Sequence, residues 1–153
     1  MQVHIKRFDE LTAGELYAIL RLRAAVFVVE QNINYQDLDD RDQAAVHVWL
    51  SENDDILAYL RVMDKGVESE DVSIGRVLCV RRGCGLGSQV VKEGIRAAKT
   101  LFHAERIYLE AQLYVKGLYE KLGFRVISEP FINEGIEHVK MLLDGSSSRR
   151  TAV

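Results

Sequence analysis

Alternating and continuous runs of apolar residues predict a series of β-strands along the chain. Residues 45–51 alternate between two faces, one of which carries His47 and Trp49, and this spacing is typical of a strand. Residues 56–63 follow a turn-forming Asn-Asp-Asp segment and are therefore expected to be its antiparallel partner. Residues 72–80 predict a long apolar strand. Shorter strands are expected at residues 3–8, 107–111, 124–127 and 138–142.

Three other segments carry apolar residues at helical spacing. The capping-box pair Thr12 and Glu15 predicts the start of a helix whose pattern continues to Glu30. Two more helices are expected over residues 90–102 and 114–122, the second of which is stopped by Gly123. The resulting order, βαβββαβαββ, predicts an α/β fold with a mixed sheet flanked by helices.

Length and charge narrow the classes of protein to which the chain can belong. Its 153 residues predict a single domain over residues 1–143, followed by a polar tail over residues 144–153. A net charge of −3 gives no basic surface for nucleic acid. Two cysteines, Cys79 and Cys84, exclude a disulfide framework and a cysteine-rich zinc site.

No apolar run has the length of a signal peptide or a membrane span, so we expect a cytoplasmic protein with no membrane partner. The sequence leaves the oligomeric state open, with a homodimer as one alternative.

The strongest chemical signal is a glycine-rich turn at residues 82–88, between the long apolar strand and the next helix. The unpaired N–H groups at a helix start favour an anion, and Gly83, Gly85 and Gly87 allow a phosphate to approach the backbone closely. A P-loop is excluded because no lysine precedes Ser88. A GxGxxG dinucleotide turn is incomplete because Ser88 replaces its third glycine, but it keeps an NAD(P)-dependent oxidoreductase as an alternative.

A third interpretation is coenzyme A, because the chain resembles the GNAT family of N-acetyltransferases. The motif Arg82-x-x-Gly85-x-Gly87 is similar to the family's pyrophosphate-binding motif, and the block Tyr119-Glu120-Lys121-Leu122-Gly123-Phe124 matches a second family motif. Within the family, the chain is most similar to the ElaA group, and the resemblance spans residues 2–143. The segments that carry this likeness are residues 22–31, residues 35–42 with His47, and residues 135–141.

The resemblance implies a mostly antiparallel central sheet that is splayed at the central strand. Acetyl-CoA, the implied cosubstrate, would insert into the gap, and no metal is expected. The implied coenzyme site consists of Leu78, Cys79, Val80, Arg82, Gly83, Gly85, Leu86, Gly87, Ser88, Gln112 and Tyr119. Gln112 stands where many members carry asparagine, and its amide offers the same donor and acceptor. A backbone N–H near Cys79 or Val80 would stabilise the oxyanion.

The implied reaction is a direct attack of a primary amine on the acetyl group. Tyr119 is the residue that the family directs at the coenzyme sulfur, and a tyrosine with an ordinary pKa of about 10 keeps the proton that a general acid needs. We expect Glu30, His47 and His138 to be the catalytic residues of the acceptor side, with Glu110 as a further candidate base.

The long polar loop over residues 31–43 is expected to cover one side of an acceptor pocket. Its four aspartates, Asp37, Asp39, Asp40 and Asp42, would either attract a cationic amine or form a hydrated acidic loop. We expect a small-molecule amine, since one compact domain has no added peptide-binding module. A coenzyme-binding protein without turnover remains a third class of function.

Overall fold

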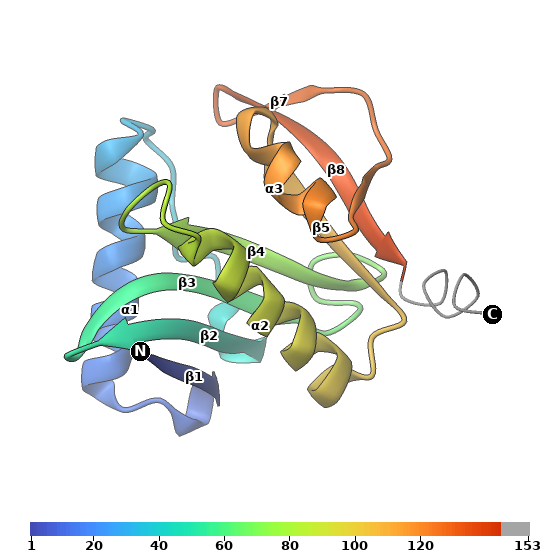
Figure 1. The fold of residues 1–153 in the computed structure, drawn as a ribbon. Coiled ribbons are helices and arrows are strands. Elements are labelled where there is room, and N and C mark those ends of the chain that lie inside the picture. The colour runs from blue at the N-terminus through green and yellow to red at the C-terminus, as the bar shows by residue number, and fades with distance from the viewer. Residues whose placement is uncertain (145–153) are drawn as a thin grey trace.

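Eight strands form one continuous sheet in the computed structural model, which describes residues 1–144 (Figure 1). Their order is β1-β2-β3-β4-β5-β8-β6, and β7 also pairs with β8. The strands are β1 (Gln2–Arg7), β2 (Ala45–Glu52), β3 (Asp55–Met63), β4 (Val72–Cys79), β5 (Arg106–Gln112), β6 (Arg125–Val126), β7 (Phe131–Asn133) and β8 (Ile136–Asp144). Every neighbouring pair is antiparallel except β4 and β5. The expected α/β fold with a mostly antiparallel sheet is therefore confirmed.

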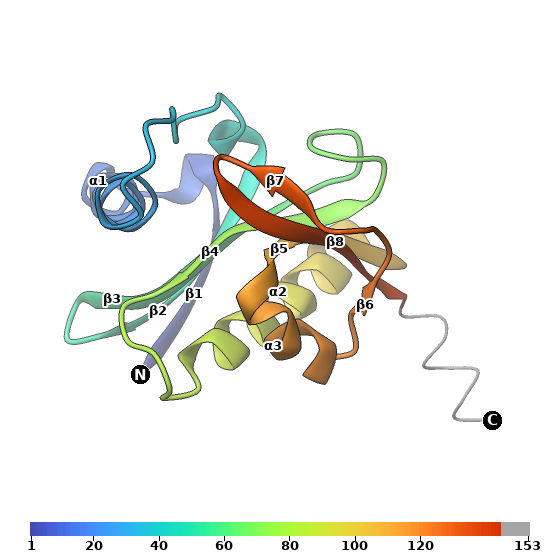
Figure 2. The same ribbon diagram turned by 90° about the horizontal axis from the view of Figure 1, so that it is seen from above.

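Helices cover both faces of this sheet (Figure 2). The helix α1 (Ala13–Arg23) lies on one face, and α2 (Leu86–Phe102) and α3 (Lys116–Lys121) lie on the other. Three short 3₁₀ turns are η1 (Phe8–Glu10), η3 (Asp42–Ala44) and η4 (Leu113–Val115). Within residues 1–144, no helix is both long enough and apolar enough to cross a membrane. The predicted tail lies outside the described residues, apart from Asp144, which ends β8.

The alternation predicted for β2 divides the core into two parts. Val48 and its neighbours on the same face pack with α2 in the larger cluster. Trp49 points to the opposite face and packs with Ile19 of α1 and Leu78 of β4. Because apolar side chains are buried on both faces, the sheet is held between two layers of helices.

The first helix begins as predicted but ends differently. The Thr12 hydroxyl accepts from the Glu15 N–H at 3.0 Å, and the Glu15 carboxylate accepts from the Thr12 N–H at 2.9 Å, which confirms the capping box. After Arg23 the α-helix gives way to a π-helical segment, η2 (Ala24–Glu30). Arg23 is fully buried and ion-paired at this junction, so the chain is anchored where its helical pitch changes.

Strand β7 is a second difference, because the predicted strand over residues 138–142 has an added hairpin partner. The two-residue turn Glu134-Gly135 links β7 to β8, and both residues have positive φ, 51° and 76°. This is the backbone of a type I′ hairpin turn. The hairpin carries Phe131 over the outer face of β8.

The parallel pair β4 and β5 diverges almost as soon as it forms. Only Val72 and Ser73 of β4 pair with β5, and the rest of β4 has no ladder partner on that side within the described chain. On its other side, β4 has a bulge, because the segment from Gly75 to Leu78 has one residue more than the segment of β3 that pairs with it. A bulge bends and twists its strand, and the expected splay at the central strand is therefore present.

Arg76 lies inside this bulge with a positive φ of 54°, which costs a non-glycine residue about 1–3 kcal/mol. Its side chain is fixed by the loop over residues 31–43. The Arg76 guanidinium donates to an Asp37 carboxylate oxygen at 2.7 Å and to the Asp37 carbonyl at 2.9 Å, and it lies 5.5 Å from the ring centroid of Tyr35.

Two further arginines complete a buried ionic cluster on the α1 face. Arg23 donates to Asp37 at 2.9 Å and to Asp42 at 2.6 Å. Arg61 of β3 donates to the same Asp42 oxygen at 2.9 Å and also pairs with Asp39. We call Arg23, Arg61, Arg76, Asp37, Asp39 and Asp42 the Arg–Asp cluster.

This cluster corrects both interpretations of the acidic loop. Asp37 and Asp42 are buried and Asp39 is half-buried, so these three are neither hydrated nor free to attract a cationic amine. Burial raises the pKa of Asp42, but hydrogen bonds and charges from Arg23 and Arg61 hold it below its usual range. Of the four aspartates only Asp40 is exposed.

We predict that Asp42→Asn lowers the free energy of unfolding by about 3 kcal/mol, because it leaves buried guanidinium charge uncompensated. The matched control is Asp40→Asn, an exposed position in the same loop, which should change stability by less than about 0.5 kcal/mol. Urea unfolding followed by the fluorescence of Trp49, the single tryptophan, measures both. Equal stability of the two variants would contradict a structural role for the cluster.

Candidate functional site

The glycine-rich turn places the start of α2 beside the end of β4, the strand that diverges from β5. Gly83 and Gly85 have positive φ values of 73° and 80°, a conformation that side chains with a Cβ rarely adopt. Gly85 is the N-cap of α2, and no side chain caps the helix there. Its first N–H groups are therefore left for an outside acceptor, as expected of an anion site.

Close packing explains the third glycine of the turn. A Cβ at Gly87 would lie 3.3 Å from the Cys79 sulfur and 3.5 Å from a Leu118 methyl carbon. The first turn of α2 therefore lies directly against both β4 and α3. This contact brings the turn and the helix of the second sequence motif to one place.

Tyr119 of α3 lies in the interior of the same region. Only 5% of its surface is exposed, and its ring packs edge-to-face on Phe124 at 5.9 Å. Burial raises the pKa of Tyr119 above its ordinary value, and the nearby Cys79 and Tyr114 raise it further. The hydroxyl therefore holds its proton at neutral pH, as a general acid must.

Arg82 and Tyr114 connect the segments that follow the two diverging strands. Arg82 donates to the Tyr114 hydroxyl at 3.4 Å, and its guanidinium lies 5.5 Å from the ring centroid. Because Arg82 follows β4 and Tyr114 follows β5, this contact spans the two sides of the splay.

The predicted coenzyme residues gather around that splay. Leu78 is buried at the end of β4, Cys79 and Gln112 are half-buried, and Val80 is 42% exposed. A pyrophosphate would suit the uncapped N–H groups of α2 and the exposed Arg82. An amide-rich arm would suit the unpaired edge of β4. The residues present therefore fit coenzyme A.

The predicted acceptor residues do not all meet at this site. Glu30 lies exposed at the end of η2, and its side chain makes no hydrogen bond or ion pair within residues 1–144. His138 is half-buried and lies opposite Gln112 in the register of β5 and β8. Its Nδ1 donates to the Ile136 carbonyl at 2.7 Å, which leaves Nε2 with a free lone pair.

His47 instead lies beside the Arg–Asp cluster, with no exposed surface. Its Nε2 donates to the Asp42 carbonyl at 3.0 Å, so Nδ1 is the acceptor for the Tyr59 hydroxyl at 2.7 Å. Burial lowers the pKa of His47, and the bond to the Asp42 carbonyl opposes this only in part. Both ring nitrogens are engaged, which favours a structural role over the predicted role as a base.

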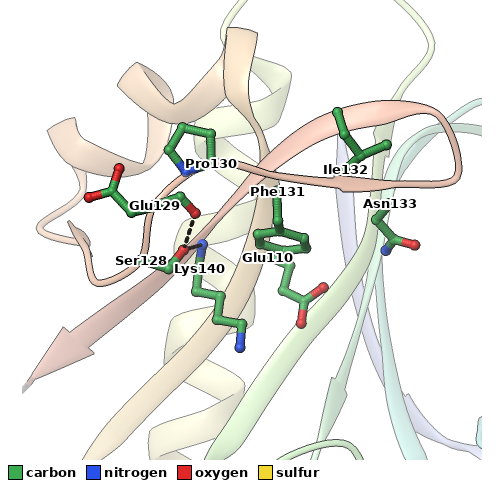
Figure 3. A pocket seen from close by; sticks show the side chains of 8 residues that line it. All are labelled: Glu110, Ser128, Glu129, Pro130, Phe131, Ile132, Asn133 and Lys140. Carbon is green, nitrogen blue, oxygen red and sulfur yellow. Dashed lines mark hydrogen bonds between the residues drawn. The ribbon is translucent and has the colours of Figure 1, made fainter.

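A pocket of about 680 Å³ opens on the face of β5 and β8 that lies opposite α2 and α3 (Figure 3). It is lined by Glu110, Ser128, Glu129, Pro130, Phe131, Ile132, Asn133 and Lys140. Glu110 was a candidate base from the sequence, but Phe131 and Lys140 were not foreseen. The signal that could have found them is the Glu134-Gly135 dipeptide, which specifies the hairpin that carries Phe131 toward β8.

Comparisons with known proteins point to one family. A sequence model of the acetyltransferase (GNAT) domain matches residues 19–144. Protein ElaA of Escherichia coli (strain K12) is 36% identical over 137 residues, which cover 87% of this chain and 90% of that protein. The crystal structure of an acyl-CoA N-acyltransferase from Pseudomonas aeruginosa superposes with a TM-score of 0.87 and 34% identity, covering 94% of this chain and 99% of that chain. The structure of Escherichia coli ElaA gives a TM-score of 0.87 with 33% identity and the same coverage.

The neutral, buried state of His47 predicts a pH dependence of stability. Its pKa is lower in the folded chain than the ordinary value of about 6.5, so the unfolded chain binds more protons just below that pH. Stability should therefore fall as the pH drops below about 6.5.

Urea unfolding at several pH values tests this, with His47→Gln as the variant and His103→Asn, at an exposed position, as the control. We expect His47→Gln to be less stable at pH 7.5 by about 1–3 kcal/mol, through loss of its buried hydrogen bonds, and to lose most of the slope between pH 6.5 and 4.5. A slope unchanged in His47→Gln but lost in the control would assign the effect to another histidine.

Proposed function

The chain belongs to the GNAT acetyltransferase family, and we propose that it is an N-acetyltransferase acting on the primary amine of a small molecule. The observation that carries the proposal is the uncapped start of α2 lying against both the splayed strand β4 and the helix of Tyr119. An NAD(P)-dependent oxidoreductase is not supported, because a doubly wound dinucleotide fold needs a parallel sheet, and among the strands of residues 1–144 only β4 and β5 are parallel.

Acetyl-CoA, when bound, supplies the thioester that the amine attacks. The N–H groups at the start of α2 and the side chain of Arg82 would hold its pyrophosphate. Leu78, Cys79 and Gln112 would line the gap between β4 and β5. These are interactions that position a cosubstrate, and they lower the entropic cost of bringing it to the amine.

The backbone of β4 supports Cys79 as the oxyanion donor rather than Val80. The Val80 N–H already donates to the Leu57 carbonyl of β3 at 2.9 Å. Successive N–H groups of a strand point to opposite sides, so the N–H of Cys79 is directed at the gap. A donor fixed there stabilises the negative charge that develops on the acetyl oxygen.

Proton transfers would be divided between the two faces of the sheet. Tyr119, on the α3 face, would protonate the departing thiolate. On the opposite face, His138 has Nε2 free to take a proton from the amine, directly or through one water. Glu30 would add negative charge on the acceptor side, and His47 would support the Arg–Asp cluster without touching substrate.

We predict that acetyl-CoA raises the melting temperature and that NAD(P)H does not. At a hundred times its dissociation constant, a ligand that binds only the folded chain adds about 2.7 kcal/mol. Arg82→Gln should reduce the shift, whereas Arg96→Gln, at an exposed site farther along α2, should not. Stabilisation by NAD(P)H alone would overturn the proposal, and binding without thiol release from any amine would indicate a non-catalytic coenzyme-binding protein.

Tyr119→Phe tests the general acid. We expect kcat to fall by about 10²–10⁴-fold, while the dissociation constant of acetyl-CoA stays nearly constant, because the proton is needed only in the transition state. Tyr17→Phe, on the exposed side of α1, is the control. If chemistry limits the rate and kcat is unchanged in Tyr119→Phe, another group protonates the thiolate.

A further inference from the structure

The pocket beside β5 is an open hollow on the surface of the sheet, lined by charged, polar and aromatic side chains. Its volume of about 680 Å³ falls within the usual range for ligand pockets. Glu110 lies two residues before Gln112 on β5, and the buried Ile107, Leu109 and Ala111 alternate with them toward α2 and α3. Two residues of a strand span about 6.6 Å, so Glu110 lies close to the predicted coenzyme residue Gln112 and on the same face.

Two opposite charges in this pocket are held apart. Glu110 and Lys140 are register partners across β5 and β8, where opposite charges usually attract. Within residues 1–144, however, neither side chain forms an ion pair. The Glu110 carboxylate accepts a hydrogen bond from the Tyr108 hydroxyl at 2.7 Å, while the Lys140 ammonium lies 6.0 Å from the ring centroid of Phe131.

An aromatic ring lies beside these charges and also contacts the candidate base. Figure 3 shows the carboxylate of Glu110 and the ammonium of Lys140 ending at separate places beside the ring of Phe131. On its other side, the ring of Phe131 is stacked with that of His138 at a centroid distance of 5.9 Å. The pocket therefore offers a carboxylate, an ammonium and an apolar surface next to His138.

We propose that this pocket binds an acceptor of the amino-acid class, a primary amine that also carries a carboxylate. Glu110 holds the ammonium of the acceptor, Lys140 holds its carboxylate, and Phe131 packs against its carbon skeleton. The inference rests on the proposed function and narrows its acceptor.

The reaction balances without any further reactant. The ammonium loses one proton to the base, the free amine forms a C–N bond to the acetyl carbon, and the C–S bond of the thioester breaks. The thiolate receives a proton from Tyr119, which is restored by the second proton of the attacking nitrogen. The products are an N-acetylated amino acid, a free thiol and one released proton.

A thiol-release assay with acetyl-CoA tests the proposal across the common amino acids. Each accepted amino acid is compared with its amide and with the amine that lacks the carboxyl group. We expect the amino acid to exceed both by about tenfold or more in kcat/KM, since charge-assisted hydrogen bonds to Lys140 are lost in the other two.

Variants of the two charged residues then separate their roles. Lys140→Met should remove the preference for the carboxylate, and Lys140→Glu should reverse it in favour of a diamine. Glu110→Gln should raise the KM of every amine about tenfold and leave the KM of acetyl-CoA unchanged. Lys99→Met on α2 and Glu137→Gln on the other face of β8, both exposed, are the matched controls and should behave as wild type.

The outcomes distinguish this inference from the proposed function. Turnover of amines without a carboxylate at equal or higher kcat/KM, or Lys140 variants that match their control, would overturn the amino-acid proposal and leave the acetyltransferase intact. Turnover of peptides only would do the same. No thiol release with any amine, in protein that acetyl-CoA stabilises, would overturn both.

Discussion

Three guanidinium groups and three carboxylates, buried or half-buried together on the α1 face, hold the parts of this fold that form the site. They tie the end of α1 and the loop over residues 31–43 to β3 and β4. Arg76 lies in the bulge of β4 with a left-handed backbone, and two hydrogen bonds to Asp37 keep it there. Since the bulge bends β4 on the segment where it separates from β5, the gap for a cosubstrate depends on ionic pairing several residues away from it.

The sheet separates the two halves of the proposed chemistry. Tyr119 and the start of α2 lie on one face, and the buried surroundings of Tyr119 keep its phenol protonated. Glu110, His138 and Lys140 lie on the other face, where charged side chains remain partly or fully exposed. A thioester in the gap between β4 and β5 would be accessible from both faces. The splay thus joins an apolar environment for the leaving group to a polar one for the amine.

Local patterns in the sequence were sufficient for most elements but not for contacts between distant residues. The capping box of Thr12, the alternation around Trp49 and the glycine-rich turn act within a few residues, so each was predicted correctly. Asp37 was not, because its partners Arg23 and Arg76 are 14 and 39 residues away in the chain. Nor could the burial of His47 be foreseen, since it arises only when the loop over residues 31–43 folds over β2. Phe131 was missed because no strand was predicted between residues 127 and 138, so no pattern placed its ring beside β8.

The short pairing between β4 and β5 also sets how the molecule deforms. Two register pairs, at Val72 and Ser73, are the direct backbone link between the strands that precede the gap and those that follow it. The two parts of the sheet are therefore joined by backbone pairing at one end and are separate at the other. Widening the gap between β4 and β5 breaks few backbone hydrogen bonds. The contact that spans the gap between Arg82 and Tyr114 is a long hydrogen bond. Away from this pairing, the two parts of the sheet are held together by side chains, because one apolar cluster spans both of them.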